Sequence, residues 1–328
     1  MPASNEDDLI ARYFRPLATS AGSFELRDDA AILGEAPGDI VVTTDAIVEG
    51  VHFFPSDPPE TIARKALRVN LSDLAAKGAA PAGFVLTLAL PQPDASWLES
   101  FAGALGQDAA LFQCPLLGGD TVSTPGPRMI SITAFGRVKV GRMVRRLGAQ
   151  AGDVVAVTGT IGDAVIGLDL LKGGPSRPAL SANRAFSDQM VGRYRVPQPR
   201  IALASAIADC AHAAMDVSDG LAGDLAKLCS VSGVSARIDL AKVPLSEPAR
   251  TVLAAGAITL EALVGGGDDY EVVCTVPATR WPALAAAGTA AGVAVTAIGE
   301  IVAGSSPPVF LDASGRPVTL TRTSYSHF

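Results

Sequence analysis

Residues 213–221 read Ala-Ala-Met-Asp-Val-Ser-Asp-Gly-Leu. In this stretch Asp residues follow an apolar run and stand beside Gly, and similar acidic stretches occur elsewhere in the chain. The apolar run 213–217 predicts a buried strand, and the Ala- and Leu-rich segment 219–231 predicts a helix. Two carboxylates, Asp216 and Asp219, therefore stand where a strand ends and a helix begins. Because side chains at such strand ends project into the crevice where open sheets bind ligands, the stretch predicts both an α/β arrangement and an acidic site.

The same acidic pattern recurs along the chain, at strand ends or beside glycine. The other places are Asp28-Asp29, Thr43-Thr44-Asp45, Asn70-Leu71-Ser72-Asp73, Gly118-Gly119-Asp120-Thr121 and Gly266-Gly267-Asp268-Asp269-Tyr270-Glu271. A turn or a helix cap explains any single one of them, and Asp153 and Asp163 are interpreted in that way. Together they predict a cluster of carboxylates that repel one another unless cations lie between them. A set rich in Asp, without grouped His or Cys, favours Mg²⁺, which prefers oxygen ligands.

Alternating strand and helix patterns extend outward from this stretch and predict a mixed α/β fold. Strands are predicted at 39–54, 84–90, 129–138, 153–158, 213–217, 235–240, 269–276 and 293–302, with short strands in the tail after 307. Helices are predicted at 6–19, 59–78, 94–113, 201–212, 219–231, 247–263 and 281–291, with another that follows a turn at 159–162 and ends near 173. Residues 173–200, rich in Pro and Arg, are expected to be partly irregular. The basic segment 139–146 is interpreted as the crossover between two domains, 1–138 and 139–328.

Length and composition limit the classes of function. The chain has 328 residues, 48% hydrophobic and 18% charged, which predicts two domains with sizeable cores. With 26 Lys and Arg against 33 Asp and Glu, the net charge is −7, and this balance argues against nucleic acid as a partner. No apolar run is long enough to span a bilayer, so no membrane is expected as a partner. The four separated Cys are interpreted as buried thiols of a cytoplasmic protein.

Mg²⁺ at an acidic site suggests a phosphorylated ligand, although the familiar phosphate-binding motifs are missing. The chain contains neither G-x-x-x-x-G-K-[ST] nor G-x-G-x-x-G. Gly159 and Gly162 stand at a strand-to-helix turn whose amides can hold an anion, but an ordinary tight turn explains them equally well.

The ordered motifs resemble the thiamine-monophosphate kinases, a family of the AIR-synthetase-related (PurM-like) superfamily. The resemblance covers essentially the whole chain and rests on the acidic stretches together with Glu49-Gly50-Val51-His52-Phe53, Thr158-Gly159-Thr160-Ile161-Gly162-Asp163 and the terminal Tyr325-Ser326-His327-Phe328. It implies a two-lobed PurM-like fold, with an N-terminal lobe that binds metal and ATP and forms a homodimer. It also implies ATP- and Mg²⁺-dependent phosphorylation of thiamine monophosphate to thiamine diphosphate by direct in-line transfer.

Carried over position by position, the resemblance assigns roles to residues of this chain. Several Mg²⁺ ions would be held by Asp29, Thr43, Thr44, Asp45, Asp73, Asp120, Asp216 and Asp219. ATP would contact Gly119, Asp120, Arg146 and Ser218, while His52, Asp268 and Tyr325 would lie on the thiamine side. No catalytic base is expected, because a phosphate monoester has its second pKa at about 6 and is already a nucleophile at neutral pH.

Two positions depart from the family pattern. Arg27 stands where the family usually has Gly, and a side chain there is awkward if the backbone needs a positive φ. Asp268 stands where the family usually has Glu, which keeps the charge but shortens its reach.

Several alternatives remain open. Other PurM-like ATP-dependent enzymes share the acidic motifs, but selenophosphate synthetase would need a reactive Cys near the N-terminus, and the first Cys here is Cys114. A hydrogenase-maturation relative would need a C-terminal Cys, which this chain lacks. From other classes of protein, a non-catalytic nucleotide or metal sensor and a metal-dependent phosphatase are the competing hypotheses.

Overall fold

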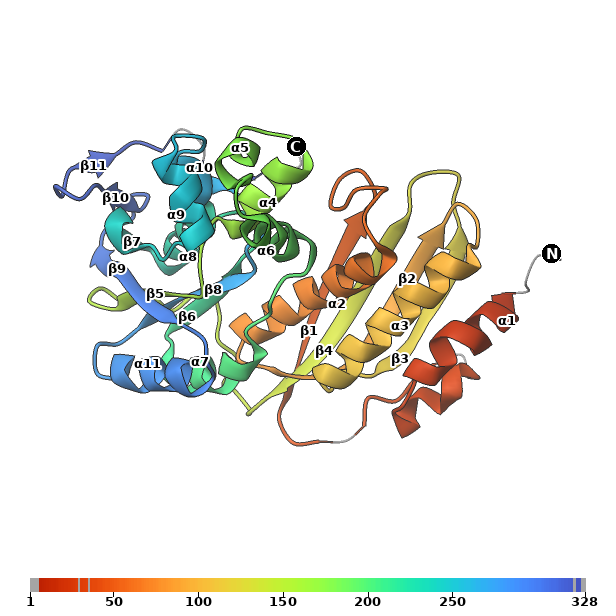
Figure 1. Cartoon of the computed structure of the whole chain (residues 1–328). Helices are drawn as coiled ribbons and strands as arrows, with labels where there is room; N and C mark the ends of the chain where they lie inside the picture. The colour runs from red at the N-terminus through yellow and green to blue at the C-terminus, as the bar shows by residue number, and fades with distance from the viewer. Residues whose placement is uncertain (1–5, 29, 35, 321–322, 326–328) are drawn as a thin grey trace. The chain divides into compact units, whose positions relative to one another are not determined.

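The structure is a computed structural model that describes residues 6–28, 30–34, 36–320 and 323–325. The chain divides into two compact units (Figure 1). The first unit comprises the chain up to Leu74 together with Ala79–Gly141, and the second comprises Ala75–Gly78 and everything from Arg142 onward.

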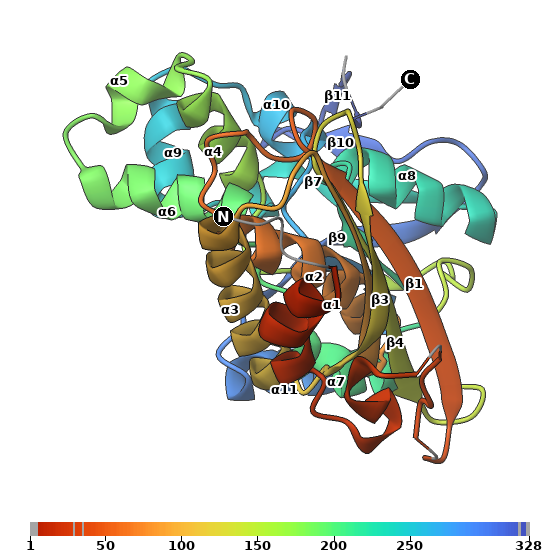
Figure 2. The same ribbon diagram turned by 90° about the vertical axis from the view of Figure 1, so that its right-hand side faces the viewer.

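The first unit is a four-stranded sheet with helices on one face. Its sheet has the strand order β1-β4-β2-β3, in which β2 and β3 are parallel and the other pairs antiparallel. Within this unit, Figure 2 shows α2 and α3 packed on one face of the sheet. The elements are α1 Glu6–Leu9, β1 Asp39–Val48, α2 Pro59–Ala76, β2 Ala80–Leu90, α3 Ala95–Leu111, β3 Leu116–Ser123 and β4 Met129–Val138, with further helical turns at 10–17 and 21–26.

The second unit is a seven-stranded sheet with the order β11-β10-β7-β9-β5-β8-β6. Helix α8 packs on one face through Leu225 and Leu228, while α7 and α11 pack on the other through Ile207 and Leu284. Its strands are β5 Val154–Thr158, β6 Ala213–Val217, β7 Val234–Asp239, β8 Glu271–Val276, β9 Val295–Ala303, β10 Val309–Leu311 and β11 Pro317–Val318. Its helices are α4 Asp163–Leu171, α5 Ser176–Leu180, α6 Arg184–Arg195, α7 Ala204–Cys210, α8 Leu221–Ser232, α9 Glu247–Ala254, α10 Leu260–Gly265 and α11 Trp281–Ala290.

The two sheets and their covering helices confirm the predicted mixed α/β class. Several predicted bounds were wrong. The strand expected to reach 54 ends at Val48, because Gly50 turns the chain with φ +81°. Residues 118–121, interpreted as an acidic turn, lie within strand β3. The stretch 173–200, expected to be partly irregular, contains the helices α5 and α6. The segment 247–263 is largely helical, as expected, and contains two helices, α9 and α10.

All four Cys are buried and free, as predicted. Burial raises the pKa of the Cys114 and Cys274 thiols to about 12, so neither is a reactive thiolate at neutral pH. None of the helices that the structure describes is long and apolar enough to cross a membrane.

Candidate functional site

In the first unit, strand β1 and helix α2 bring three of the predicted metal-site groups together. The Thr43 hydroxyl donates to a carboxylate oxygen of Asp73 at 2.5 Å, which joins the strand to the helix. One helical turn before Asp73, the buried side chain of Asn70 accepts a hydrogen bond from the Asp45 amide at 3.0 Å. Asn70 therefore sets the backbone that presents Asp45. The sequence analysis gave Asn70 no role, because its partner became visible only once the helix lay on the strand.

Thr44 and Asp120 lie on the face of the same sheet opposite to α2 and α3 (Figure 2), and both residues are exposed. The Thr44 hydroxyl accepts from the Thr133 hydroxyl across β1 and β4, and Asp120 is paired in register with Thr87 of β2. The two residues are carried by opposite edge strands, with β4 and β2 between them. Three strand spacings separate these edges by roughly 14 Å, far more than two ligands of one ion can span. One chain therefore does not bring Asp120 to Asp45 or Thr44.

His52 lies in the turn that follows β1. Its Nδ1 accepts a hydrogen bond from the Val48 amide at 3.0 Å, so the neutral ring carries its proton on Nε2. The buried Lys65 of α2 donates to the His52 carbonyl at 3.0 Å, which ties the turn to the helix. The predicted thiamine-side histidine is thus held as a donor through Nε2.

In the second unit, a single buried carboxylate organises the acidic loop between β6 and α8. Asp224 lies in the first turn of α8 and is fully buried. One of its oxygens accepts the amides of Ser218, Asp219 and Gly220, at 3.0, 2.9 and 3.2 Å. Gly220 has φ +125°, and a Cβ there would meet the backbone of Gly265 at 2.8 Å, so the loop requires glycine.

The carbonyls of this loop accept from two other segments. The Tyr270 amide donates to Val217 and the Asp268 amide to Ser218, each at 2.8 Å, while the Tyr325 amide donates to Asp219 at 2.9 Å. Asp268 and Tyr270 have positive φ angles of 72° and 50°, which these contacts hold in place. These backbone bonds hold the residues Ser218, Asp219, Asp268 and Tyr325 on adjoining segments of the second unit. Their roles toward a ligand remain predictions. Asp216 precedes the loop as a buried residue of β6.

Asp219 has a cationic partner that the sequence analysis did not foresee. Lys227, two turns along α8, donates to Asp219 at 2.6 Å and to Asp224 at 2.9 Å. Burial alone would lower the pKa of Lys227, but the hydrogen bonds to Asp219 and Asp224 outweigh it and raise that pKa. Burial raises the pKa of Asp224, and Lys227 opposes the shift. The spacing of Asp224 and Lys227 on one helix face was the only sequence signal for either residue.

Behind the 266–270 segment lies a buried ionic network. Glu271 accepts from the Thr158 hydroxyl at 2.7 Å, from Arg193 at 2.7 Å and from Arg200 at 2.5 Å. Arg193 also donates to the Asp269 carbonyl at 3.3 Å, and the Asp269 carboxylate accepts the Gly162 amide at 2.8 Å. A carboxylate of the chain thus occupies the glycine turn at 159–162, which supports the tight-turn interpretation. Asp163 accepts from Thr160 and Ser246, and Asp153 accepts the Gln150 amide, in line with their interpretation as structural residues.

The remaining predicted residues lie apart from this loop or outside the described chain. The Arg146 carbonyl accepts from Ser232 at the C-terminal end of α8, the far end from Ser218. Arg27 has φ −115°, so its backbone does not need glycine, and its exposed side chain lies 3.3 Å from Glu25. Asp29, His327 and Phe328 lie outside the described residues. Gly119 lies in β3, where a Cβ would meet the Leu86 carbonyl oxygen at 2.0 Å.

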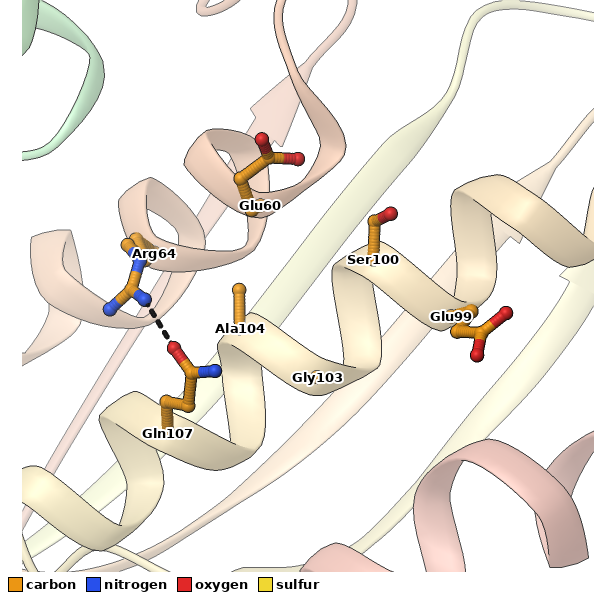
Figure 3. A pocket seen from close by; sticks show the side chains of 7 residues that line it. All are labelled: Glu60, Arg64, Glu99, Ser100, Gly103, Ala104 and Gln107. Carbon is orange, nitrogen blue, oxygen red and sulfur yellow. Dashed lines mark hydrogen bonds between the residues drawn. The ribbon is translucent and has the colours of Figure 1, made fainter.

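Within the described ranges, no three His, Cys, Asp or Glu side chains lie close enough together to hold one metal ion. A groove between α2 and α3 offers no alternative site (Figure 3), because its charged groups are spread along two helices and Arg64 already donates to Gln107 at 2.6 Å. It is lined by Glu60, Arg64, Glu99, Ser100, Gly103, Ala104 and Gln107. None of the predicted site residues lines it.

Both units match models of known protein families. Residues 27–138 match the family model described as AIR synthase related protein, N-terminal domain, and residues 150–312 match the corresponding C-terminal domain. The chain is 43% identical to a thiamine-monophosphate kinase of Caulobacter vibrioides, over 98% of this chain and 90% of that protein.

The fold is also similar to solved structures of thiamine-monophosphate kinases. A crystal structure of thiamine-monophosphate kinase from Stenotrophomonas maltophilia is 36% identical, covers 89% of this chain and 90% of its own, and has a TM-score of 0.80. A structure described as AaThiL complexed with AMPPCP and TMP is 30% identical, covers 98% of this chain and 97% of its own, and has a TM-score of 0.76.

The Asp269→Asn substitution should change how stability depends on pH. Burial raises the pKa of Asp269 well above its ordinary value of 3.8. The folded chain then keeps a proton that the unfolded chain has released, so stability from this group is present below about pH 4 and is lost as pH rises through the folded pKa. Asn does not titrate. The Tm of the variant minus that of the wild type should therefore rise by about 2–4 °C between about pH 5 and about pH 8, measured by calorimetry.

The matched control is Asp188→Asn, which changes a carboxylate that is 70% exposed. Its Tm difference from the wild type should stay constant over the same pH range. A constant difference for Asp269→Asn as well would show that Asp269 is ionised at all these pH values, contrary to the prediction.

Proposed function

The chain belongs to the thiamine-monophosphate kinase family of AIR synthase related proteins, and from this premise we propose how its residues perform the reaction. It is an enzyme of the phosphotransferase class, and the resemblance seen in its motifs is confirmed. We propose that it transfers the γ-phosphoryl group of ATP to thiamine monophosphate and forms thiamine diphosphate and ADP. We further propose that it acts in the cytoplasm, where its four buried thiols stay reduced.

One observation carries the proposal: the loop Val217–Gly220 presents Ser218 and Asp219 beside Asp268 and Tyr325. Its amides donate hydrogen bonds to Asp224, and its carbonyls accept hydrogen bonds from the 266–270 segment and from Tyr325. Such a loop is pre-organised, so its side chains meet a ligand without a further ordering cost. A relative with 30% identity and the same fold has been solved with AMPPCP and TMP, which supports an ATP-dependent function for these groups.

The residues present fit Mg²⁺ by their chemistry. Every proposed ligand offers a carboxylate or hydroxyl oxygen, and the oxygens of Thr43 and Asp73 lie side by side at 2.5 Å. Mg²⁺ at phosphate sites commonly takes only one or two protein carboxylates and completes its shell with phosphate oxygens and water. We therefore propose that several ions are held by Asp29, Thr43, Thr44, Asp45, Asp73, Asp120, Asp216 and Asp219. When bound, Mg²⁺ would neutralise charge on the phosphates that meet there.

The chain's own task is to align two polyanions. A phosphate oxygen of thiamine monophosphate attacks the γ-phosphorus of ATP in line with the bond to the bridging oxygen, that bond breaks, and ADP leaves. No protein base is needed, because the attacking oxygen carries no proton that must be removed at neutral pH. We propose that Gly119, Asp120, Arg146 and Ser218 contact ATP. Arg146 would act by its positive charge.

The thiamine side is proposed to use three residues with different chemistry. His52 would donate a hydrogen bond through Nε2, because its Nδ1 already accepts from Val48. Asp268 would face the positively charged thiazolium with its carboxylate. Tyr325, a residue that is 41% exposed, would stack on one of the flat rings.

A homodimer is proposed through the face of the first-unit sheet that lies opposite to α2 and α3. Ile40 and Val42 of β1 are 53% and 57% exposed there, a larger apolar exposure than a solvated strand usually carries. The face also carries Thr44 on one edge strand, and Asp120 lies about three strands away on the other. Pairing of two copies through this face would let Asp120 of the partner subunit approach Thr44, which a single chain does not do.

The direct test of the function is a product assay with an acceptor panel. Purified chain, ATP and Mg²⁺ should yield one ADP and one thiamine diphosphate per turnover with thiamine monophosphate, measured by liquid chromatography. Removal of Mg²⁺ with EDTA should abolish transfer. ATP hydrolysis alone, or transfer only to another acceptor, would refute the assignment, and phosphate release without ATP would favour a phosphatase.

Asp73→Asn and Asp216→Asn should each lower kcat at saturating Mg²⁺ by at least about 100-fold, because a charged ligand oxygen is lost. The amide oxygen that Asp73→Asn introduces still accepts from the Thr43 hydroxyl, so the fold should survive, as circular dichroism can verify. Asp209→Asn, at a carboxylate 55% exposed, is the control and should leave kcat unchanged. Near wild-type turnover of both site variants would contradict their role as metal ligands.

Tyr325→Ala should raise the KM for thiamine monophosphate by about 3- to 30-fold and leave the KM for ATP nearly unchanged. The substitution keeps the backbone amide that donates to Asp219, so Tm should change little. Tyr325→Phe retains the ring and should behave like the wild type. Equal shifts in the two KM values would remove Tyr325 from the thiamine side.

Val42→Glu should convert the dimer to monomer, because pairing would bury an uncompensated charge and raise the dimer Kd by about 100-fold. Sedimentation velocity measures the change. Val231→Glu is the matched control, since Val231 is similarly exposed, at 51%, but lies on α8. A Val42→Glu chain that sediments like the wild type would exclude this face as the interface.

A further inference from the structure

Lys227 is positioned to bind the same carboxylate that the proposed function assigns to Mg²⁺. It lies one turn after Asp224 on α8, and its ammonium donates to one oxygen of Asp219 at 2.6 Å and to one oxygen of Asp224 at 2.9 Å. The Lys227 side chain is 42% exposed and that of Asp219 is 37% exposed, whereas Asp224 is fully buried. The ammonium therefore joins a buried carboxylate to one that solvent and ions can reach.

The two carboxylates differ in how firmly they are held. Asp224 accepts three loop amides through its other oxygen, so it cannot leave without unfolding the loop. Asp219 is fixed through its backbone, whose amide donates to Asp224 and whose carbonyl accepts from Tyr325. Its side chain is held by Lys227 at the exposed end. Asp219 is thus the member of the pair that can exchange its partner.

We propose that Lys227 is a tethered cation that neutralises Asp219 in the metal-free enzyme, competes with Mg²⁺ for that carboxylate and so sets the Mg²⁺ concentration at which the Asp219 site fills. This inference rests on the proposed function, which makes Asp219 a metal ligand. A divalent ion on Asp219 and an ammonium hydrogen-bonded to the same carboxylate repel each other at close range. Binding of a divalent ion to Asp219 must therefore either displace Lys227 or overcome this repulsion. Asp224 holds the loop in place with and without the ion.

Removal of the ammonium should then tighten metal binding. Lys227→Met keeps an unbranched side chain of similar length and removes only the charge and the donors. We expect it to lower the Kd for Mn²⁺ at the Asp219 site by about 3- to 10-fold, given the partial exposure of the pair. Without metal the variant should be less stable than the wild type, because Asp219 and Asp224 lose their cation. Its Tm should rise at lower Mg²⁺ concentrations than that of the wild type.

The experiment uses the full chain, freed of metal with EDTA. Mn²⁺ binding is followed by electron paramagnetic resonance of the free ion, and Tm is recorded against Mg²⁺ concentration. Lys242→Met is the matched control: Lys242 pairs with Asp239 at 3.4 Å in the same i,i+3 spacing, on an exposed surface without proposed metal ligands. It should leave both curves unchanged. Lys227→Gln, which keeps hydrogen bonding without charge, serves if Lys227→Met does not fold.

The Asp219→Asn variant tests whether Lys227 acts through Asp219. Lys227→Met should have no effect on Mn²⁺ binding when Asp219 is already replaced by Asn, as a double-mutant cycle can establish. Unchanged or weaker Mn²⁺ binding by both Lys227 variants would overturn the inference while the kinase proposal stands. If Asp219→Asn alone left Mn²⁺ binding intact, the inference would also fall, and Asp219 would leave the set of ligands. Failure of the kinase proposal itself shows separately, as absent thiamine diphosphate in the product assay.

Discussion

The carboxylate of Asp224 is the group on which the loop between β6 and α8 depends. A buried charge is costly unless its hydrogen-bonding capacity is filled, and Asp224 achieves this with three consecutive amides and one ammonium. Those amides belong to the loop that ends β6, so one side chain converts a flexible turn into a rigid one. The 266–270 segment and the tail then dock on the loop carbonyls. The backbone positions of Ser218, Asp268 and Tyr325 are therefore linked to Asp224 through this loop.

Strong local patterns allowed much of the fold to be predicted from sequence. Strands β4 and β6 were predicted with their observed bounds, because apolar residues alternate or run continuously between clear breaks. Strand β3 was missed, since Gly118, Gly119 and Asp120 are poor strand formers on local propensity. Its pairing with β2 overrides that propensity, and Gly119 is needed there because a Cβ would collide with the Leu86 carbonyl. Tertiary pairing of this kind leaves no trace in a local window.

The sequence suggested the residues that we propose to face the ligands, but it did not suggest the residues that support them. Asp, Thr and Ser at strand ends suggest a site for a metal ion and phosphate, because their side chains offer oxygen ligands. Asn70, Asp224 and Lys227 act on other residues, and their partners lie on elements that only packing brings near. The Asp268 and Tyr270 backbones, both at positive φ, likewise needed the loop contacts to be explained. A motif therefore suggests which groups are proposed to meet the ligand, whereas the groups that hold them in place follow from the folded structure.

We propose that two pairs of side-chain oxygens, Thr43 with Asp73 and Asp216 with Asp219, help to hold the metal ions of the reaction. Anomalous scattering from crystals grown with Mn²⁺, thiamine monophosphate and a non-hydrolysable ATP analogue measures this directly. We expect Mn²⁺ peaks within about 2.5 Å of side-chain oxygens in both pairs, with phosphate oxygens completing each coordination shell. Peaks that touch only phosphate and water, with neither pair of side chains within reach, would contradict it.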